Sequence, residues 1–215
     1  MIGIFHGLRA RRRAAIPALV VLACLAPATG RASELPLFAT VSERAPVPIG
    51  WTQFCTTYLK ECDTQPSIPR DVEFSEKGSD DLILVNQWVN HNVKPMTDMD
   101  HYGMIQWWRY PDDGAGACHS YALLKRQLLM QRGWPREALL MTIVREDYGR
   151  GAGHAVLTVK TDRGEFILDN LTDEIRLWSK APYRFFKRQS QTDPNAWVWL
   201  NDLRTDAATA TSRVR

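Results

Sequence analysis

The 215-residue sequence has no apolar run long enough to span a membrane, no internal repeat and no linker between domains. Its longest apolar stretch, residues 14 to about 26, is shorter than the roughly 20 residues that a membrane helix needs. His91, His101 and His119 show no spacing typical of a metal site. The chain beyond its first 32 residues is long enough for one domain with a substantial core.

The first 32 residues are typical of a secretory signal. Arg9 and residues 11–13 form a basic start, the apolar run follows, and the small residues Gly30 and Ala32 permit cleavage before Ser33. An uncleaved N-terminal anchor is the alternative, and "VLAC" is a weak match to a lipoprotein box. We therefore predict a signal peptide over 1–32 and export to the periplasm.

The charge of the chain gives no indication of a nucleic-acid partner. Residues 1–32 contain five arginines and no acidic residue, so their removal leaves 22 basic against 24 acidic residues. The exported chain then carries a charge near −2, and its alkaline pI belongs largely to the signal. We expect no nucleic-acid binding, one domain over 33–203, and a disordered polar tail over 204–215.

Loss of the signal removes Cys24 and leaves three cysteines. Because exported proteins mature in an oxidising compartment, Cys55 and Cys62 are predicted to form a disulfide. On one continuous helix they would lie about 10 Å apart, so the helix must break near Glu61. Two free buried thiols are the alternative. In either case Cys118 stays unpaired.

Helical spacing of apolar residues predicts helices over 48–62, 75–93 and 118–132. Ser79 or Asp80 is the expected N-cap of the second helix. In the third helix, residues 125–127 are polar and are predicted to face solvent. Residues 33–50 are expected to be extended, and 96–117 to form a loop.

Alternating patterns predict strands over 138–144, 154–160, 165–170, 183–190 and 196–200. Helices followed by an antiparallel meander predict an α+β domain in which N-terminal helices pack on an antiparallel sheet.

The hairpin "HAVLTVKTDRGEFILDN" predicts its own register. Pairing Lys160 with Glu165 puts Leu157 opposite Leu168 and creates an apolar face, whereas a one-residue slip would destroy that face. In this register His154 and Asp169 are diagonal neighbours on one face, close enough for their side chains to meet.

These residues suggest a thiol hydrolase. A helix N-terminus and a nearby imidazolium both stabilise a thiolate at Cys118, and a carboxylate orients the histidine. His154 would protonate the leaving amine, backbone N–H groups around Cys118 would stabilise the oxyanion, and Gly114 and Gly116 would let a substrate backbone approach. His119 points about 100° away around the helix and is predicted to be a poor base.

The hairpin resembles that of the bacterial transglutaminase-like cysteine proteinases, which include LapG-type periplasmic proteases, and so do the motifs "GWTQFC", "VNQWVN", "CHSYALLKRQLLMQRGWP" and "PYRFFKRQSQ". The resemblance covers about residues 48–200 and implies a papain/transglutaminase-like fold. The family's Cys-His-Asp order falls on Cys118, His154 and Asp169. It also implies a protein substrate such as a surface adhesin whose cleavage releases a biofilm, and an inner-membrane regulator.

The resemblance further implies calcium, bound by acidic residues in a "DCED" pattern around the cysteine. Here residues 117–120 read "ACHS", and calcium needs several oxygen ligands. Asp112 and Asp113 are the nearest acidic substitutes. The sequence therefore predicts no cofactor and departs from the family in its calcium ligands.

Three functions remain open. The first is a protease or amidase that forms a thioester acyl-enzyme on Cys118. The second is a transglutaminase-like enzyme that passes the acyl group to an amine, and the third is a non-catalytic binding module on the same fold. Trp107, Trp108 and Tyr110 are expected to line a substrate groove or to pack in the core.

Overall fold

A computed structural model describes residues 1–3, 36–63, 65–202 and 204. The predicted signal peptide lies outside the described residues except for 1–3, and so does the predicted tail except for Arg204. Leu35–Arg215 forms one compact unit and Met1–Glu34 is assigned to another. Within the described residues, no helix is both long enough and apolar enough to cross a membrane.

Seven strands form one antiparallel sheet in the order β1-β9-β8-β4-β5-β6-β7. The strands are β1 (Thr40–Ala45), β4 (Leu139–Arg145), β5 (Gly153–Thr161), β6 (Gly164–Leu168), β7 (Arg176–Leu177), β8 (Arg184–Gln189) and β9 (Trp197–Asn201). Five of them are those expected from the sequence. The extended entry segment contributes β1, and β7 is a further short strand.

The predicted meander is correct only from β4 to β7. After β7 the chain returns to the opposite side of β4, so β8 pairs with β4, and β9 and β1 extend that half of the sheet. A strand pattern in the sequence does not say which edge a later strand joins. The buried strand β4 thus lies at the centre of the sheet.

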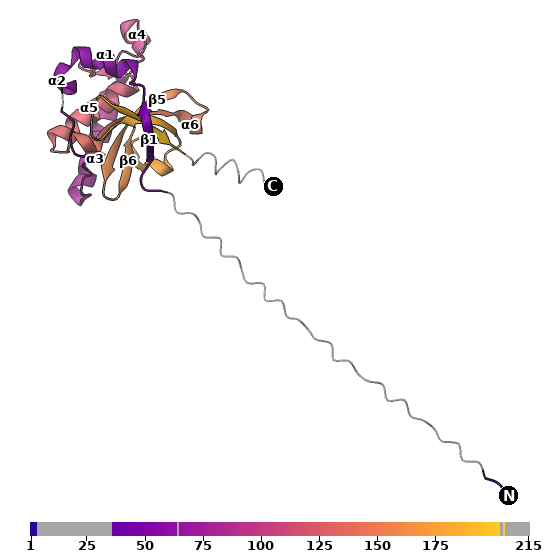
Figure 1. The fold of residues 1–215 in the computed structure, drawn as a ribbon. Coiled ribbons are helices and arrows are strands. Elements are labelled where there is room, and N and C mark those ends of the chain that lie inside the picture. The colour runs from indigo at the N-terminus through magenta and orange to yellow at the C-terminus, as the bar shows by residue number, and fades with distance from the viewer. Residues whose placement is uncertain (4–35, 64, 203, 205–215) are drawn as a thin grey trace. The chain divides into compact units, whose positions relative to one another are not determined.

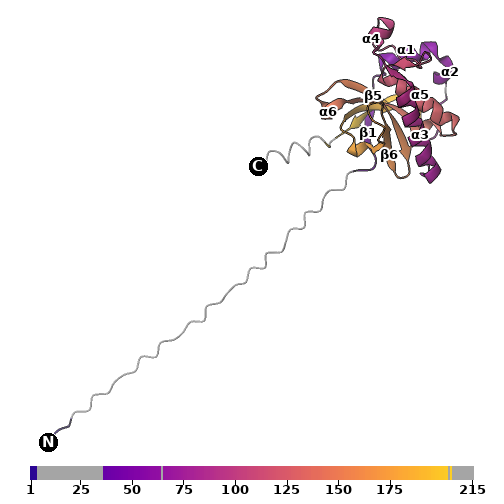
Figure 2. The same cartoon turned by 180° about the vertical axis from the view of Figure 1, so that it is seen from behind.

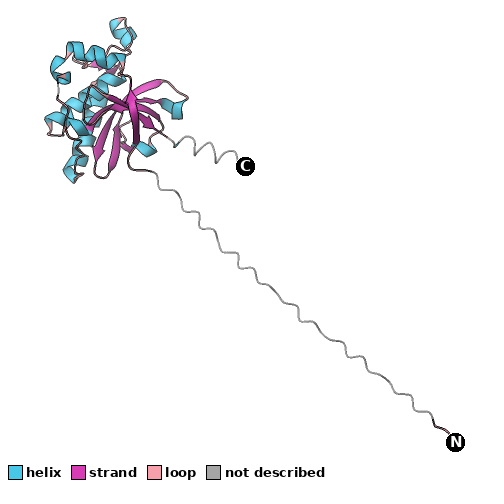
Figure 3. Cartoon of the chain, viewed as in Figure 1, coloured by secondary structure: helices cyan, strands magenta, loops and turns pink. Residues whose placement is uncertain are grey.

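The helices α1 (Ile49–Thr57), α2 (Leu59–Cys62), α3 (Glu76–Asn92) and α5 (Cys118–Gln131) gather on one side of the sheet (Figures 1 and 3). The view from behind shows the same separation of helices and strands (Figure 2). The shorter elements are β2 (Lys94–Pro95), α4 (Asp98–Tyr102), β3 (Ala115–Gly116), η1 (Arg136–Ala138), α6 (Glu146–Gly149) and η2 (Trp178–Lys180). β2 and β3 form a separate parallel pair. This α+β architecture agrees with the prediction.

The main core lies between the helices and the sheet. It includes Trp51, Val85, Tyr121, Leu157 and Trp197, and a second cluster, which includes Val156 and Phe185, covers the other sheet face. Because residues of a strand alternate between faces, β5 contributes to both clusters.

The expected outward direction of residues 125–127 in α5 is wrong for two of the three. Lys125 is 0% exposed and Arg126 1% exposed, whereas Gln127 is half-buried. α5 packs against α3 as well as β4 and β5, so most of its circumference is covered. Long cationic side chains there lie inside the protein.

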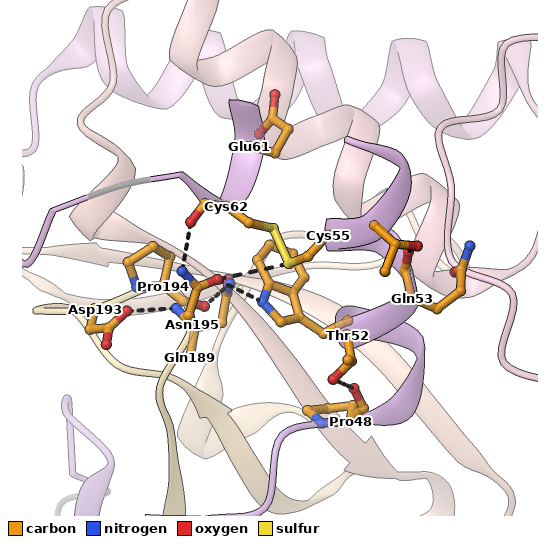
Figure 4. The surroundings of a disulfide bond; sticks show 12 residues. Pro48, Thr52, Gln53, Cys55, Glu61, Cys62, Gln189, Asp193, Pro194 and Asn195 are labelled. Carbon is orange, nitrogen blue, oxygen red and sulfur yellow. Dashed lines mark hydrogen bonds between the residues drawn. A yellow bond between two sulfur atoms is a disulfide. The ribbon is translucent and has the colours of Figure 1, made fainter. Parts of the chain in front are cut away.

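The disulfide between Cys55 and Cys62 is present, with 5.5 Å between the Cα atoms (Figure 4). The helix breaks at Tyr58 (φ −115°, ψ 62°), earlier than the expected break near Glu61. The Nδ2 of Asn195 donates to the carbonyl of Cys62 at 2.7 Å, which ties the α2 turn to the segment before β9.

The N-cap of α3 also differs from the prediction. Ser75, rather than Ser79 or Asp80, accepts a hydrogen bond from the N–H of Gly78 at 3.1 Å. The helix therefore begins one turn earlier than a cap at Ser79 or Asp80 would allow, and that turn carries Gly78 against the ring of Trp134.

The predicted hairpin register is confirmed. Leu157 pairs with Leu168, Val159 with Phe166, and Lys160 with Glu165. The Nζ of Lys160 donates to Oε1 of Glu165 at 3.0 Å. The apolar face identified in the sequence is therefore the one packed under α5.

Candidate active site

Cys118 is the first residue of α5, and it is the free cysteine of the described part of the chain. The first N–H groups of a helix lack intrahelical partners and carry a partial positive charge, which favours an anion at this position. Gly114 has φ +80°, and a Cβ on Gly116 would lie 2.6 Å from the Cβ of Ser120. Both glycines are thus needed for the turn that leads into α5.

His154 and Asp169 meet as the hairpin register predicts. The Nε2 of His154 lies 2.8 Å from Oδ1 of Asp169, and both side chains are buried. This contact leaves Nδ1 of the imidazole available to the thiol. The sequence-predicted pair is therefore formed, on the ends of β5 and β6.

Asp169 is fixed by further donors. Its Oδ1 accepts from the N–H of Leu171 at 3.1 Å, and its Oδ2 accepts from the hydroxyl of Tyr183. Asn90 of α3 donates to its backbone carbonyl at 3.0 Å. Burial alone would raise the pKa of this carboxyl, but hydrogen bonding and charge from His154, with help from Tyr183, hold the pKa below its usual range.

The site favours a thiolate–imidazolium pair. Burial alone would raise the pKa of the Cys118 thiol, but hydrogen bonds and charge from His119 and His154 lower it to about 6. Burial acts to lower the pKa of His154, yet Asp169 and Cys118 raise it well above its ordinary value. Each charged form stabilises the other, so the surroundings favour an anionic sulfur and a cationic ring.

His119 follows Cys118 on α5, and its hydrogen bonding and charge help to lower the pKa of the thiol. Its Nε2 lies 3.2 Å from Oδ1 of Asp98, at the start of α4, and its ring stacks on Trp108 with centroids 5.2 Å apart. This carboxylate partner was not expected, because α4, only five residues long, was predicted to be loop. Asp98 and Tyr183 are thus two partners that sequence reasoning missed, since neither belongs to a recognisable motif.

Two hollows lie beside the thiol, and Cys118, Gly153 and His154 line both. One has a volume of about 670 Å³ and is largely apolar, with Pro46, Ile49 and Ile143 in its wall. The other has a volume of about 590 Å³, and its wall includes the acidic residues Asp98, Asp100 and Glu146. A bound chain could therefore extend away from Cys118 in two directions.

The three aromatic residues before the cysteine have separate positions. Trp108 is buried in the core and also lines the apolar hollow, whereas Tyr110 is a core residue. Trp107 is half-buried, and its N–H donates to Oδ2 of Asp98 at 2.8 Å. Trp108 thus packs in the core and also borders the hollow beside Cys118, while a role in a substrate groove stays a prediction.

The residues around Cys118 do not fit calcium. Ala117 and Ser120 carry no carboxylate and His119 is a cationic neighbour, whereas calcium takes six to eight oxygen ligands. Asp113 accepts from Nε2 of His101 at 2.7 Å and from the N–H of Ala115 at 3.3 Å. The residues that the structure describes contain no group of three or more His, Cys, Asp and Glu suited to a metal.

A thiol at a helix N-terminus that faces an imidazole–carboxylate pair on a sheet defines the class of papain-like and transglutaminase-like thiol hydrolases. The chain belongs to the bacterial transglutaminase-like cysteine proteinase family, whose sequence model matches residues 41–205. It is thus a member of a cysteine peptidase family, and its substrate class is protein.

Solved structures of LapG from Legionella pneumophila are similar to this chain. The calcium-bound structure is 21% identical, covers 62% of this chain and 80% of its own, and gives a TM-score of 0.48. A second LapG structure is 22% identical, with coverages of 64% and 78% and a TM-score of 0.46. An EGTA-treated one is 23% identical, with coverages of 58% and 68% and a TM-score of 0.47. A search of curated proteins finds no match. Similarity this distant transfers no residue role or ligand to this chain.

Proposed function

We propose that this chain is an exported cysteine protease in which Cys118 is the nucleophile, His154 the general acid and base, and Asp169 the orienting carboxylate. The observation that carries the proposal is the buried contact of 2.8 Å between His154 and Asp169 beside a free thiol at a helix N-terminus. If these residues lay separately in the hydrophobic core or on the surface, His154 and Asp169 would not meet beside the thiol.

The reaction begins with the Cys118 thiolate, which attacks the carbonyl carbon of the scissile amide. The oxyanion lies near the unpartnered N–H groups at the start of α5. Nδ1 of the His154 imidazolium then gives its proton to the leaving amine, and the C–N bond breaks to leave a thioester on Cys118. Neutral His154 removes a proton from water, the hydroxide attacks the thioester, and the carboxylic acid product leaves as the thiolate re-forms.

The two hollows support an extended polypeptide as the substrate. They meet at Cys118 and His154, so residues on both sides of the scissile bond find walls to contact. With 1–32 as a signal peptide and 33–203 as the catalytic domain, the enzyme would meet periplasmic or surface proteins, for example an adhesin, under the control of an inner-membrane regulator. No step of the proposed reaction uses calcium.

The test is acyl-enzyme formation on the full chain. p-Nitrophenyl acetate should give a burst of one nitrophenolate per protein, and mass spectrometry should find the acetyl group on Cys118. The burst should disappear in Cys118→Ala and fall strongly in His154→Gln. His91→Gln, at an exposed position of α3, is the matched control and should behave as the wild type. No acetylation of Cys118 would contradict the proposal and leave a binding module.

A second arm separates hydrolysis from transfer. Exported proteins of the same bacterium are incubated with the chain, and new N-termini are labelled and counted against Cys118→Ala. New N-termini are expected for a protease. Incorporation of an added primary amine into those proteins, without new N-termini, would instead establish acyl transfer.

A further inference from the structure

A second histidine–carboxylate pair lies beside the thiol. The Nε2 of His119 is 3.2 Å from Oδ1 of Asp98, and the two side chains are only 6% and 9% exposed. Neither atom has another hydrogen-bond partner among the residues that the structure describes. Because an isolated buried charge is costly, each group depends on the other for compensation.

The surrounding segment holds this pair in place. Trp108 stacks on the imidazole of His119 with an interplanar angle of 7°. The N–H of Trp107 donates to Oδ2 of Asp98, and Thr97 caps the turn that carries Asp98 by accepting from the N–H of Asp100 at 3.1 Å. Residues 97–108 thus fix both members of the pair through backbone and ring contacts.

Both imidazoles lower the pKa of the Cys118 thiol through hydrogen bonding and charge, and they come from two different elements of the fold. His154 comes from β5 and is backed by Asp169, whereas His119 follows Cys118 on α5 and is backed by Asp98. The two rings line the same apolar hollow. The thiol therefore has two histidine–carboxylate partners, of which the proposed reaction uses only one.

We propose that His119, held by Asp98, is a positioning residue that stabilises the Cys118 thiolate independently of His154. This inference rests on the proposed function, in which Cys118 is the nucleophile. His119 transfers no proton in the reaction. It supplies a fixed positive charge next to the sulfur.

Such a charge has a defined use in the reaction cycle. His154 is neutral in the thioester intermediate and becomes cationic again once it has removed a proton from water. The thiolate that then leaves carries a negative charge, which His154 alone would otherwise have to offset. A protonated His119 beside the leaving sulfur would stabilise that charge without taking part in proton transfer.

The electrostatics of the two groups are consistent with this role. Burial disfavours the charged form of His119, yet Asp98 and Cys118 raise its pKa to about 9. Two other charged groups at the hollows are engaged elsewhere. Lys187 donates to the carbonyl of Pro46 at 2.7 Å, and Asp100 accepts from the hydroxyl of Thr97 at 2.6 Å. Glu146 lines the acidic hollow, on the other side of Cys118 from the apolar hollow that contains His119.

The experiment is a double-mutant cycle on the full chain. The alkylation rate of Cys118 by iodoacetamide is measured against pH in the wild type, His119→Gln, His154→Gln and the double variant. Mass spectrometry of the Cys118 peptide excludes any signal from Cys24. The wild-type midpoint is expected near the pKa of about 6. Each single variant should move it upward by about one pH unit or more, and the double variant should reach or exceed the free-thiol value of about 8.5.

Two results would overturn the inference. One is a His119→Gln midpoint equal to that of the wild type, and the other is a His154→Gln midpoint already equal to that of the double variant. A wild-type midpoint near 8.5 would instead refute the proposed function itself, so the two failures are distinguishable.

Further variants separate charge from structure. Asp98→Asn keeps His119 in place and should move the midpoint in the same direction, with no added effect in the His119→Gln background. If His119→Gln does not fold, the alkylation midpoint of Asp98→Asn tests the same positive charge. His91→Gln, at an exposed position of α3, is the control and should leave the midpoint at the wild-type value.

Discussion

His154 and Asp169 are joined by a contact of 2.8 Å between Nε2 and Oδ1, and each residue is at most 5% exposed. The pair lies at the ends of β5 and β6, just beyond Leu157 and Leu168, the last paired residues of the hairpin. A backbone register that is set by apolar packing thus determines the position of two polar side chains.

Tyr183→Phe tests the support of this pair. The hydroxyl of Tyr183 donates to Oδ2 of Asp169, and without it the carboxylate holds His154 less firmly. We expect the acylation rate of Cys118 to fall by about 10-fold, as for other groups that orient a catalytic ligand. Ester hydrolysis measured against pH is the readout. Tyr148→Phe, at an exposed position, is the control, and equal rates for both variants would contradict the assigned role.

Glu165→Gln tests a buried ion network. Glu165 accepts from Nζ of Lys160 at 3.0 Å and from Nη1 of Arg188 at 2.7 Å, and all three side chains are buried. The substitution leaves two buried cations without a full counter-charge, so the free energy of unfolding should fall by about 3–5 kcal/mol in urea titrations. Glu174→Gln, in an exposed pair with Arg176, should cause little change. Similar losses for both variants would contradict a special role for the network.

Lys125→Met tests a buried lysine on α5. Burial lowers the pKa of Lys125 to about 7, although the charges of Asp169 and Asp173 oppose the shift. The folded state therefore binds fewer protons at this group than the unfolded state, whose pKa is about 10.4. Burial of the charged lysine therefore lowers the free energy of unfolding. This loss is fully present below pH 7 and disappears as the pH rises toward about 10.4.

The variant should accordingly unfold with a free energy about 1–4 kcal/mol higher at and below neutral pH, with the gain vanishing near pH 10. Urea titrations at several pH values measure this difference. Lys77→Met, at an exposed position of α3, is the control. A gain that does not depend on pH would show that apolar packing, and not the lysine charge, is responsible.

Chelation tests the departure from the calcium pattern. Because Ala117, His119 and Ser120 offer no carboxylate, EGTA should change the acylation rate by less than about twofold, and added calcium should have no effect. The rate of nitrophenolate release with and without EGTA is the measurement. Loss of activity with EGTA that calcium restores would require a site built from other residues.

The parts of the fold that the sequence predicts are those with a local pattern. The strand hairpin carries an alternating apolar face, and the Cys118 helix ends at Gln131, two residues before Gly133, which has φ +92°. These patterns also place Cys118, His154 and Asp169. Nothing local indicates that α5 is covered by both α3 and the sheet, and for that reason Lys125 and Arg126 were expected to face solvent.

The missing partners come from segments without such a pattern. Asp98 lies on a helix of five residues, and Tyr183 reaches Asp169 only after the chain has returned toward the other side of β4. The contact between His119 and Asp98 depends on the path of residues 97–108, which spacing within α5 cannot indicate. The sequence shows which residue types are present, but it does not show which distant segments of the chain come together at this site.

The central claim is that Cys118 is a thiolate activated within the folded site. Its most direct test is the alkylation rate of Cys118 in the wild-type full chain against pH, compared with the same chain unfolded in urea. We predict a midpoint near pH 6 in the folded protein, in line with the pKa of about 6, and a midpoint near 8.5 in the unfolded protein. The same midpoint near 8.5 in both states would contradict the claim.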